Sequence, residues 1–266
     1  MKILFLSHAF NGLAQRLFVE LAALGHEVSI EIDVNDAVTA EAVALAAPDL
    51  IIAPFLKRAI PASIFSRVPC FVVHPGIPGD RGPSALDWAI LEGEADWGVT
   101  VLQAEAEMDA GPVWASRCFR MRAAPKSSLY RREVAEGAAQ AVLEAVARFA
   151  RGDAPMSLAE LGEDARGRAR PLMLQADRAI DWENDDTRTV LAKIHAADGF
   201  PGVRDTILCR EVLLFGAHDG KGDVPQFSGK MGNVPDFRGA VMATRDGAIL
   251  RRTVDEIGRA SCRERV

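Results

Sequence analysis

The chain has 266 residues, of which 49% are hydrophobic and 26% charged, with a formal net charge of −6. This composition is typical of a soluble globular protein with one large domain, or a medium domain and a smaller one. Its apolar runs are far shorter than the ~20 residues needed to cross a bilayer. The chain also lacks a secretory apolar segment at its start and a basic surplus, so we expect a cytoplasmic protein that contacts neither membrane nor nucleic acid.

Neither the cysteines nor the histidines are spaced as metal ligands. The four cysteines, Cys70, Cys118, Cys209 and Cys262, lie far apart without a C-x-x-C pair. This spacing argues against a disulfide framework and against a zinc cluster. The five histidines show no paired ligand spacing either. We therefore expect no metal site and a small molecule as the partner.

Short β-branched runs alternate with helical patterns over the first 150 residues. Strands are predicted at 2–7, 28–32, 50–55, 70–73 and 99–103, and helices at 13–24, 37–46, 84–93 and 129–149. The alternation predicts an α/β fold with a mostly parallel, doubly wound sheet covered on both faces. Ligands of such sheets bind at the carboxyl ends of the strands.

The composition changes after residue 150. Residues 151–170 are rich in Gly, Asp, Arg and Pro, which is typical of a connection between domains. A helix is then predicted at 187–197 and strands at 211–216, 239–244 and 248–254, which indicates a smaller, incomplete, β-rich and OB-like domain. We expect a first domain at 1–165, a linker at 166–182 and the β domain at 183–255, and we interpret 256–266 as a non-native tail.

The predicted strand ending near Val73 carries the most informative loop. It delivers His74, followed by a Gly/Pro-rich loop that contains Arg81 and Gly82. A histidine at the carboxyl end of a strand can exchange protons near neutral pH and act as a general acid or base. Position alone also allows a loop histidine that is hydrogen-bonded to a backbone carbonyl. The single Gly12 after the first strand does not make the G-x-G-x-x-G of a dinucleotide site.

A second polar loop follows the predicted strand at 99–103. It contains Asp109 within the text MDAGP at 108–112. If this strand and the one before His74 are parallel neighbours, their ends bring Asp109 within reach of His74. A carboxylate in that place could hold the tautomer of the imidazole or favour its protonated form.

Together these stretches resemble the 10-formyltetrahydrofolate-dependent formyltransferase family, whose motif is N-x-H-P-S, a loop ending in R-G, and M-D-x-G-P about thirty-five residues later. The corresponding text is VVHPG at 72–76, RG at 81–82 and MDAGP at 108–112. Further on, AIDW at 179–182 and IHAADGFPG at 194–202 resemble the junction and opening of the second domain of methionyl-tRNA formyltransferases. The resemblance covers residues 1 to about 255.

Within the family, the chain most resembles the branch that takes part in [NiFe] hydrogenase maturation. The similar segments are FLSHAFN at 5–11, APFLKRAIP at 53–61, GDRGPS at 79–84 and WGVTVLQA at 97–104. The resemblance implies an enzyme that uses 10-formyltetrahydrofolate to make the carbon monoxide ligand of the hydrogenase, with coenzyme A as the expected formyl acceptor and contact with the maturation machinery. A crotonase-like part that would release carbon monoxide is expected to be missing from this chain.

The resemblance also implies roles for particular residues. His74 and Asp109 would be catalytic: the acceptor attacks the formyl carbon, His74 stabilises or protonates the intermediate, and Asp109 orients His74 and manages the proton transfer. The folate would be contacted by the segment after the third strand and by the loop after His74. These residues are Leu56, Lys57, Arg58, Arg81 and Gly82. For each of the three cations among them, the alternative interpretation is a solvated surface charge without a role in binding.

One position departs from the family motif, since Val72 stands where the motif has asparagine. An asparagine amide can donate a hydrogen bond to the oxyanion that forms when the formyl carbon is attacked, and loss of such a donor costs about 2.7 to 4 kcal/mol of transition-state stabilisation. Valine cannot donate. Either His74 carries that charge alone, or a backbone N–H or another side chain, such as that of Ser84, substitutes for the amide.

Other functions stay open at this stage. A methionyl-tRNA formyltransferase needs a basic second domain, but residues 183–255 hold 10 Lys and Arg against 11 Asp and Glu. A formyltetrahydrofolate hydrolase would use water as the acceptor, and Val72 also allows a folate-binding module without catalysis. A hydrolase triad of Ser84, His74 and Asp109 would lack the G-x-S-x-G elbow.

Overall fold

The computed structural model describes residues 1–207, 210–219, 241–244 and 247–256. By internal contacts the chain divides into two units. The first contains residues 1–85, 95–121 and 130–172, and the second contains 86–94, 122–129 and the chain from 173 onwards. Most of the suspected non-native tail, including Cys262, lies outside the described residues. Within the described part, no helix is long and apolar enough to span a membrane.

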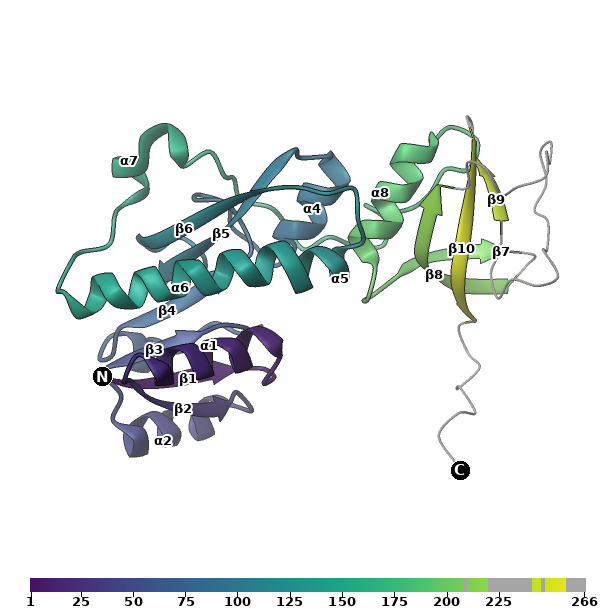
Figure 1. Ribbon diagram of the computed structural model, residues 1–266. Helices are drawn as coiled ribbons and strands as arrows, with labels where there is room; N and C mark the ends of the chain where they lie inside the picture. Colours follow the sequence, from purple (N-terminus) through teal and green to yellow (C-terminus); the bar gives the residue numbers. More distant parts are fainter. Residues whose placement is uncertain (208–209, 220–240, 245–246, 257–266) are drawn as a thin grey trace, which may run out of the picture. The chain divides into compact units, whose positions relative to one another are not determined.

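The first unit is built on a six-stranded sheet (Figure 1). Its strands are β1 (Lys2–Ser7), β2 (Glu27–Ile32), β3 (Leu50–Ala53), β4 (Cys70–His74), β5 (Asp96–Gln103) and β6 (Val113–Arg120). The order is β2-β1-β3-β4-β5-β6. The first four pair in parallel, whereas β5 is antiparallel to both β4 and β6. The predicted mostly parallel sheet is confirmed, but the expected parallel pairing of the fourth and fifth strands is wrong, and β6 was not predicted.

Helices cover both faces of this sheet. One face packs against α1 (Gly12–Ala23) and α6 (Ala135–Ala150), which follows the short α5 (Lys126–Leu129) and the π-helix η1 (Tyr130–Val134). The other face packs against α2 (Asp36–Ala46) and α3 (Ala62–Phe65). Asn11 and Asn35 cap α1 and α2, each accepting a hydrogen bond from the backbone N–H three residues later.

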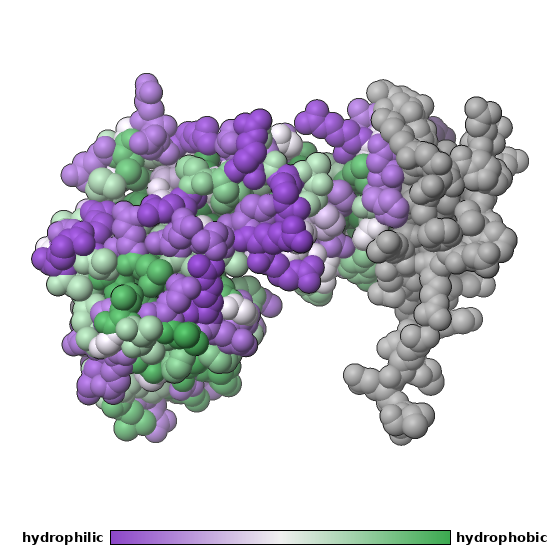
Figure 2. Space-filling view, viewed as in Figure 1, coloured by the Kyte–Doolittle hydropathy of each residue, from purple (hydrophilic) through white to green (hydrophobic). Residues whose placement is uncertain are grey.

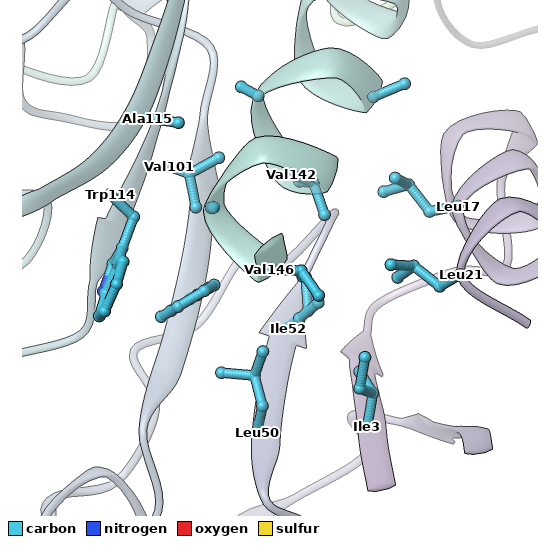
Figure 3. Packing of buried hydrophobic residues seen from close by; sticks show 14 of the residues in the cluster. Ile3, Leu17, Leu21, Leu50, Ile52, Val101, Trp114, Ala115, Val142 and Val146 are labelled. Atoms are coloured by element: carbon cyan, nitrogen blue, oxygen red, sulfur yellow. The ribbon is translucent and has the colours of Figure 1, made fainter. Parts of the chain in front are cut away.

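The core under α1 and α6 is a continuous apolar layer. Figure 3 shows Leu17 and Leu21 of α1 and Val142 and Val146 of α6 pointing towards the strands that carry Ile3 and Ile52. All of these side chains are at most 1% exposed. The inner face of α6 is rich in buried alanines, which lets the helix lie close to the strands.

Residues 151–170 belong to the first unit. They contain α7 (Leu158–Leu161), which begins with a capping box between Ser157 and Glu160, and the 3₁₀-helix η2 (Gly162–Asp164). Met156 pairs with Val113 at the start of β6, and Ala169 pairs with Arg81 in the loop after His74. The segment therefore returns to the Gly/Pro-rich loop that follows His74.

The second unit contains a smaller antiparallel sheet. Its strands are β7 (Val203–Ile207), β8 (Arg210–Asp219), β9 (Val241–Thr244) and β10 (Gly247–Glu256), in the order β7-β8-β10-β9. Helix α8 (Thr187–Ala197) packs Val190 and Ile194 against this sheet, and α4 (Ala85–Glu92) belongs almost wholly to the same unit. The predicted small β-rich unit is confirmed, although β7 was not predicted.

Candidate active site

His74 is the last residue of β4 and lies in a buried position at the carboxyl edge of the parallel strands. It is 4% exposed and pairs across the sheet with Thr100. The Thr100 hydroxyl donates to the carbonyl of Gly76 at 2.8 Å, and the Trp97 indole donates to the carbonyl of Pro75 at 2.9 Å. These two bonds from β5 hold the backbone at the start of the loop after His74.

Asp109 lies beside the imidazole, but not for the predicted reason. Because β5 is antiparallel to β4, its carboxyl end at Gln103 pairs with Phe71, away from His74. The loop at 104–112 instead leaves next to Cys70 and folds back. This brings the Asp109 Oδ2 to 3.6 Å from the His74 Nδ1.

The backbone around Asp109 is specialised for this approach. Asp109 has φ of 57°, a left-handed conformation that few non-glycine residues adopt. A side chain at Gly111 would overlap the carbonyl of Gln103, so only glycine lets the loop close there. The N–H of Gly82 donates to the Asp109 Oδ2 at 3.2 Å. The two loops singled out in the sequence are therefore bonded to each other.

A second carboxylate, which the sequence patterns did not predict, lies at the imidazole. The Asp80 Oδ1 lies 2.9 Å from the His74 Nε2, and Asp80 is 1% exposed. Its other oxygen, Oδ2, lies 3.2 Å from the Nε of Arg170, whose guanidinium stacks over the Trp97 ring at 5.4 Å. The available signal was an acidic residue in a Gly/Pro-rich loop next to the chosen histidine. Nothing in the sequence pointed to Arg170, which comes from a segment interpreted as a connection.

A hollow of about 210 Å³ opens beside Asp109. Its lining residues come from three loops, those after β4 and β5 and the segment before residue 172: Arg81, Gly82, Glu107, Met108, Asp109, Ala169 and Arg170. Arg81 pairs with Glu107 across it. Met108 is 53% exposed at its rim. The hollow therefore offers a cation, a carboxylate and an exposed apolar side chain beside Asp109, which in turn lies next to His74.

The residues expected to contact folate after β3 occupy three different environments. Leu56 is partly buried against the apolar cluster under α2 and α3. The Lys57 ammonium lies over the Phe55 ring, 5.9 Å from its centroid. Arg58 pairs with Asp33 and Asp36 and donates to the carbonyl of Val34. Of the predicted folate contacts, the structure places Arg81 and Gly82 at the hollow beside Asp109, whereas Arg58 turns towards the end of β2.

The position of the family asparagine offers no hydrogen-bond donor. Val72 is partly buried, packs with the apolar cluster under α2 and α3, and pairs with Leu102 of β5. Metal ligands are equally scarce, since no group of three His, Cys, Asp or Glu side chains in the described part of the chain could hold an ion. The polar chemistry of the site therefore lies in the His74, Asp80 and Asp109 side chains and the surrounding N–H groups.

A second, larger hollow lies between β6 and the helices on the α1 side of the sheet. It has a volume of about 500 Å³ and is lined by four arginines, Arg16, Arg117, Arg131 and Arg132, together with the exposed Cys118. Arg16 pairs with Glu136 at 2.6 Å, and Arg117 pairs with Glu144. Figure 2 shows a band of hydrophilic residues across this unit, over the position of α6 in Figure 1.

Comparison with known proteins places this chain in a family. Residues 27–146 match the Formyl transferase family. The hydrogenase maturation factor HoxX of Bradyrhizobium diazoefficiens is 55% identical over 96% of this chain and 43% of its own length. A methionyl-tRNA formyltransferase of Roseiflexus castenholzii is 31% identical over 70% of this chain and 58% of its own.

Solved structures agree with this placement. A crystal structure of HypX from Aquifex aeolicus in complex with tetrahydrofolic acid is 47% identical and superposes with a TM-score of 0.88. The match covers 97% of this chain and 44% of that one. This chain thus spans less than half the length of the HypX and HoxX proteins it matches.

The fold, the placement of His74 beside Asp109 and these matches define a protein of the formyltransferase family, to which this chain belongs. The sequence identity to HoxX and the superposition on HypX indicate which members of the family this chain resembles. The chain corresponds to the N-terminal formyltransferase part of the hydrogenase maturation factors HypX and HoxX.

Proposed function

We propose that this chain transfers the formyl group of 10-formyltetrahydrofolate to the thiol of coenzyme A, as the first step in making the carbon monoxide ligand of a [NiFe] hydrogenase. The observation that carries the proposal is the buried His74 with Asp109 at 3.6 Å, beside a hollow at the carboxyl edge of the sheet. The bound tetrahydrofolic acid of the A. aeolicus HypX structure supports a folate as the donor.

The folate would approach through the hollow beside Asp109. Charge-assisted hydrogen bonds from Arg81 would suit the carboxylates of its glutamate tail, and the exposed Met108 would suit the apolar face of its ring. Leu56 and Lys57 remain further candidate contacts. Arg58 is a weaker candidate because two carboxylates already neutralise it.

The proposed reaction conserves both atoms and protons. The sulfur of coenzyme A attacks the formyl carbon, the bond between that carbon and N10 of the folate breaks, and a carbon–sulfur bond forms. The thiol proton ends on N10, giving tetrahydrofolate and formyl-coenzyme A. His74 passes this proton and, when protonated, donates to the oxyanion of the tetrahedral intermediate. Val72 cannot donate a hydrogen bond to this oxyanion, so His74 must supply more of the stabilisation than in proteins with the asparagine of the family motif.

Arg131 and Arg132 of the second hollow support coenzyme A as the acceptor, because its phosphates need cations, whereas Arg16 and Arg117 are already paired with Glu136 and Glu144. Ser116 of β6 pairs with Thr100 of β5, and Thr100 pairs with His74. Arg117 is the next residue along β6, so its side chain points to the opposite face of the sheet from those of Ser116 and His74, towards Glu144 of α6. An extended thiol arm would therefore have to pass around β6, which is the edge strand, to reach His74.

The biological setting and the domain limits are proposals as well. The similarity to HoxX supports contact with the hydrogenase maturation machinery in the cytoplasm. The chain at 183–255 would be a partial form of the C-terminal domain of methionyl-tRNA formyltransferases, reached through a linker that ends near 182. The pairing of Arg170 with Asp80 favours a catalytic domain that reaches past residue 165.

The test offers one formyl donor to different acceptors in separate reactions. The chain is incubated with 10-formyltetrahydrofolate and either coenzyme A, methionyl-tRNA or buffer, and the products are identified by mass spectrometry. We expect formyl-coenzyme A in amounts equal to tetrahydrofolate. Replacing Arg131 and Arg132 by alanine should raise KM for coenzyme A and leave KM for the folate unchanged. Formate as the product in every arm would instead favour the hydrolase.

A further inference from the structure

We propose that Asp80 is a positioning residue that holds the proton of His74 on Nε2 and leaves Nδ1 as the nitrogen that exchanges protons with the substrates. This inference rests on the proposed formyl transfer, because it specifies how His74 takes part in that reaction. It moves the task of orienting the imidazole from Asp109 to Asp80.

The two distances decide which carboxylate binds the ring. The Asp80 Oδ1 lies 2.9 Å from Nε2, which is hydrogen-bond distance, whereas the Asp109 Oδ2 lies 3.6 Å from Nδ1, which is too long for one. A carboxylate only accepts hydrogen bonds, so a short contact with Nε2 requires a proton on that nitrogen. In the neutral imidazole, Nδ1 then carries the lone pair and faces Asp109.

The surroundings of Asp80 place a cation beside it and hold it in position. Its side chain is fully buried, and its second oxygen lies 3.2 Å from the Arg170 Nε, whose side chain is 7% exposed. The guanidinium therefore supplies the opposite charge beside the buried carboxylate whose other oxygen contacts Nε2. The backbone of Arg170 is fixed as well, since its N–H donates to the carbonyl of Arg81 at 2.8 Å.

The loop is shaped for this contact. Asp80 reaches the imidazole through a turn in which its N–H donates to the carbonyl of Ile77 at 2.9 Å. A side chain at Gly76 would lie 2.7 Å from the Asp80 Oδ1 and 2.6 Å from the His74 Cδ2. A Cβ atom at that position would therefore occupy the space where the two side chains meet.

Two carboxylates at the His74 ring and the arginine behind one of them then have separate tasks. Asp80 fixes the tautomer, Arg170 neutralises Asp80, and Asp109 is left next to the working nitrogen. When Nδ1 receives the thiol proton, the imidazolium lies between two carboxylates and can donate that proton onward to N10 of the folate. The arrangement follows the logic of a histidine whose second nitrogen is bound by a buried carboxylate.

The first test needs no variant. Nitrogen NMR of the imidazoles in the full chain, labelled with ¹⁵N-histidine, reports which nitrogen carries the proton, and His74→Gln identifies the His74 signals among five histidines. We expect the Nε2–H tautomer in the absence of substrates. The Nδ1–H tautomer as the main form would overturn the proposal, whatever the formyl acceptor proves to be.

The second test is Asp80→Asn, with Asp153→Asn as a matched control. Asp153 is a partly exposed carboxylate that pairs with Arg151 at 2.7 Å on the same unit. For Asp80→Asn we expect a mixture of His74 tautomers and a fall in kcat for tetrahydrofolate formation of roughly 10² to 10⁴-fold, with little change in KM for the folate. For Asp153→Asn we expect the wild-type rate and tautomer. A folded Asp80→Asn protein with wild-type kcat would overturn the proposal.

The two tests separate this inference from the proposed function. If the wild-type chain does not formylate coenzyme A but His74 shows the Nε2–H tautomer, which becomes mixed in Asp80→Asn, the acceptor is wrong and the role of Asp80 stands. If the wild-type chain formylates coenzyme A and Asp80→Asn does so at the same rate, the acceptor stands and the role of Asp80 is refuted.

Discussion

Gly76→Ala tests whether the geometry of the imidazole limits the reaction. An alanine Cβ at position 76 would overlap the His74 Nε2 and lie 2.7 Å from the Asp80 Oδ1, against an ordinary contact distance of 3.4 Å or more. The imidazole and the carboxylate must therefore move away from the new Cβ, the nearest imidazole atom by about 1 Å. Overpacking of this kind costs about 1 to 3 kcal/mol of stability. A displacement near 1 Å in an active site lowers the rate by roughly 10²-fold.

The assay for Gly76→Ala is kcat for tetrahydrofolate formation, measured together with the urea midpoint of unfolding. Gly12→Ala is the control, because an added Cβ at that position in the first turn of α1 meets nothing within 4 Å. We expect wild-type kcat for the control and a roughly 30- to 100-fold loss for Gly76→Ala below its unfolding midpoint. A folded Gly76→Ala protein with wild-type kcat would show that the His74–Asp80 contact is not needed for the reaction.

Three further predictions follow from the structure. Asp109→Asn should keep the fold and lower kcat by at least roughly 10²-fold in the same assay, and unchanged turnover would remove Asp109 from the mechanism. Burial raises the pKa of the Cys70 thiol to about 12. At pH 8, maleimide should therefore modify Cys70 about 10³-fold more slowly in the folded chain than in the unfolded chain, whereas the exposed Cys118 should react rapidly in both. Peptide mapping measures the two rates. Hydrogen bonds from Ser157 lower the pKa of the Glu160 carboxyl, so its stabilisation is present above the unfolded pKa of about 4.5 and is lost as the pH falls through the folded value. Between pH 5 and pH 3 the wild-type chain should lose more free energy of unfolding in urea than Glu160→Gln, and equal losses would contradict the capping role.

Sequence patterns predicted the fold class because β-branched runs and helical spacing are local signals. The helix at Thr187–Ala197 and the strand at Lys2–Ser7 occur with the predicted limits. Pairing direction is not a local property. Nothing in the residues of β5 distinguishes a parallel from an antiparallel neighbour, and β6 was missed because its pattern of Arg, Ser and Cys between apolar residues is weak. The short β7 was missed for the same reason, with two charged residues among five.

The candidate site was predictable only in part. His74 and Asp109 follow predicted strands and match a family motif, so the sequence pointed to both. Asp80 carries no periodic signal, and its contact with His74 depends on how a Gly/Pro-rich loop folds back. Arg170 lies about ninety residues further along the chain, in a segment whose composition indicated a connection. Its pairing with Asp80 depends on tertiary structure, which local pattern does not encode.

The most direct measurement follows the formyl carbon itself. The chain is given 10-formyltetrahydrofolate with a ¹³C-labelled formyl group and an excess of coenzyme A, and carbon NMR records where the label goes during the reaction. The account predicts a formyl thioester signal that grows as the donor signal falls, with His74→Gln abolishing both changes. Label that appears only as formate, or transfer at the wild-type rate in His74→Gln, would contradict it.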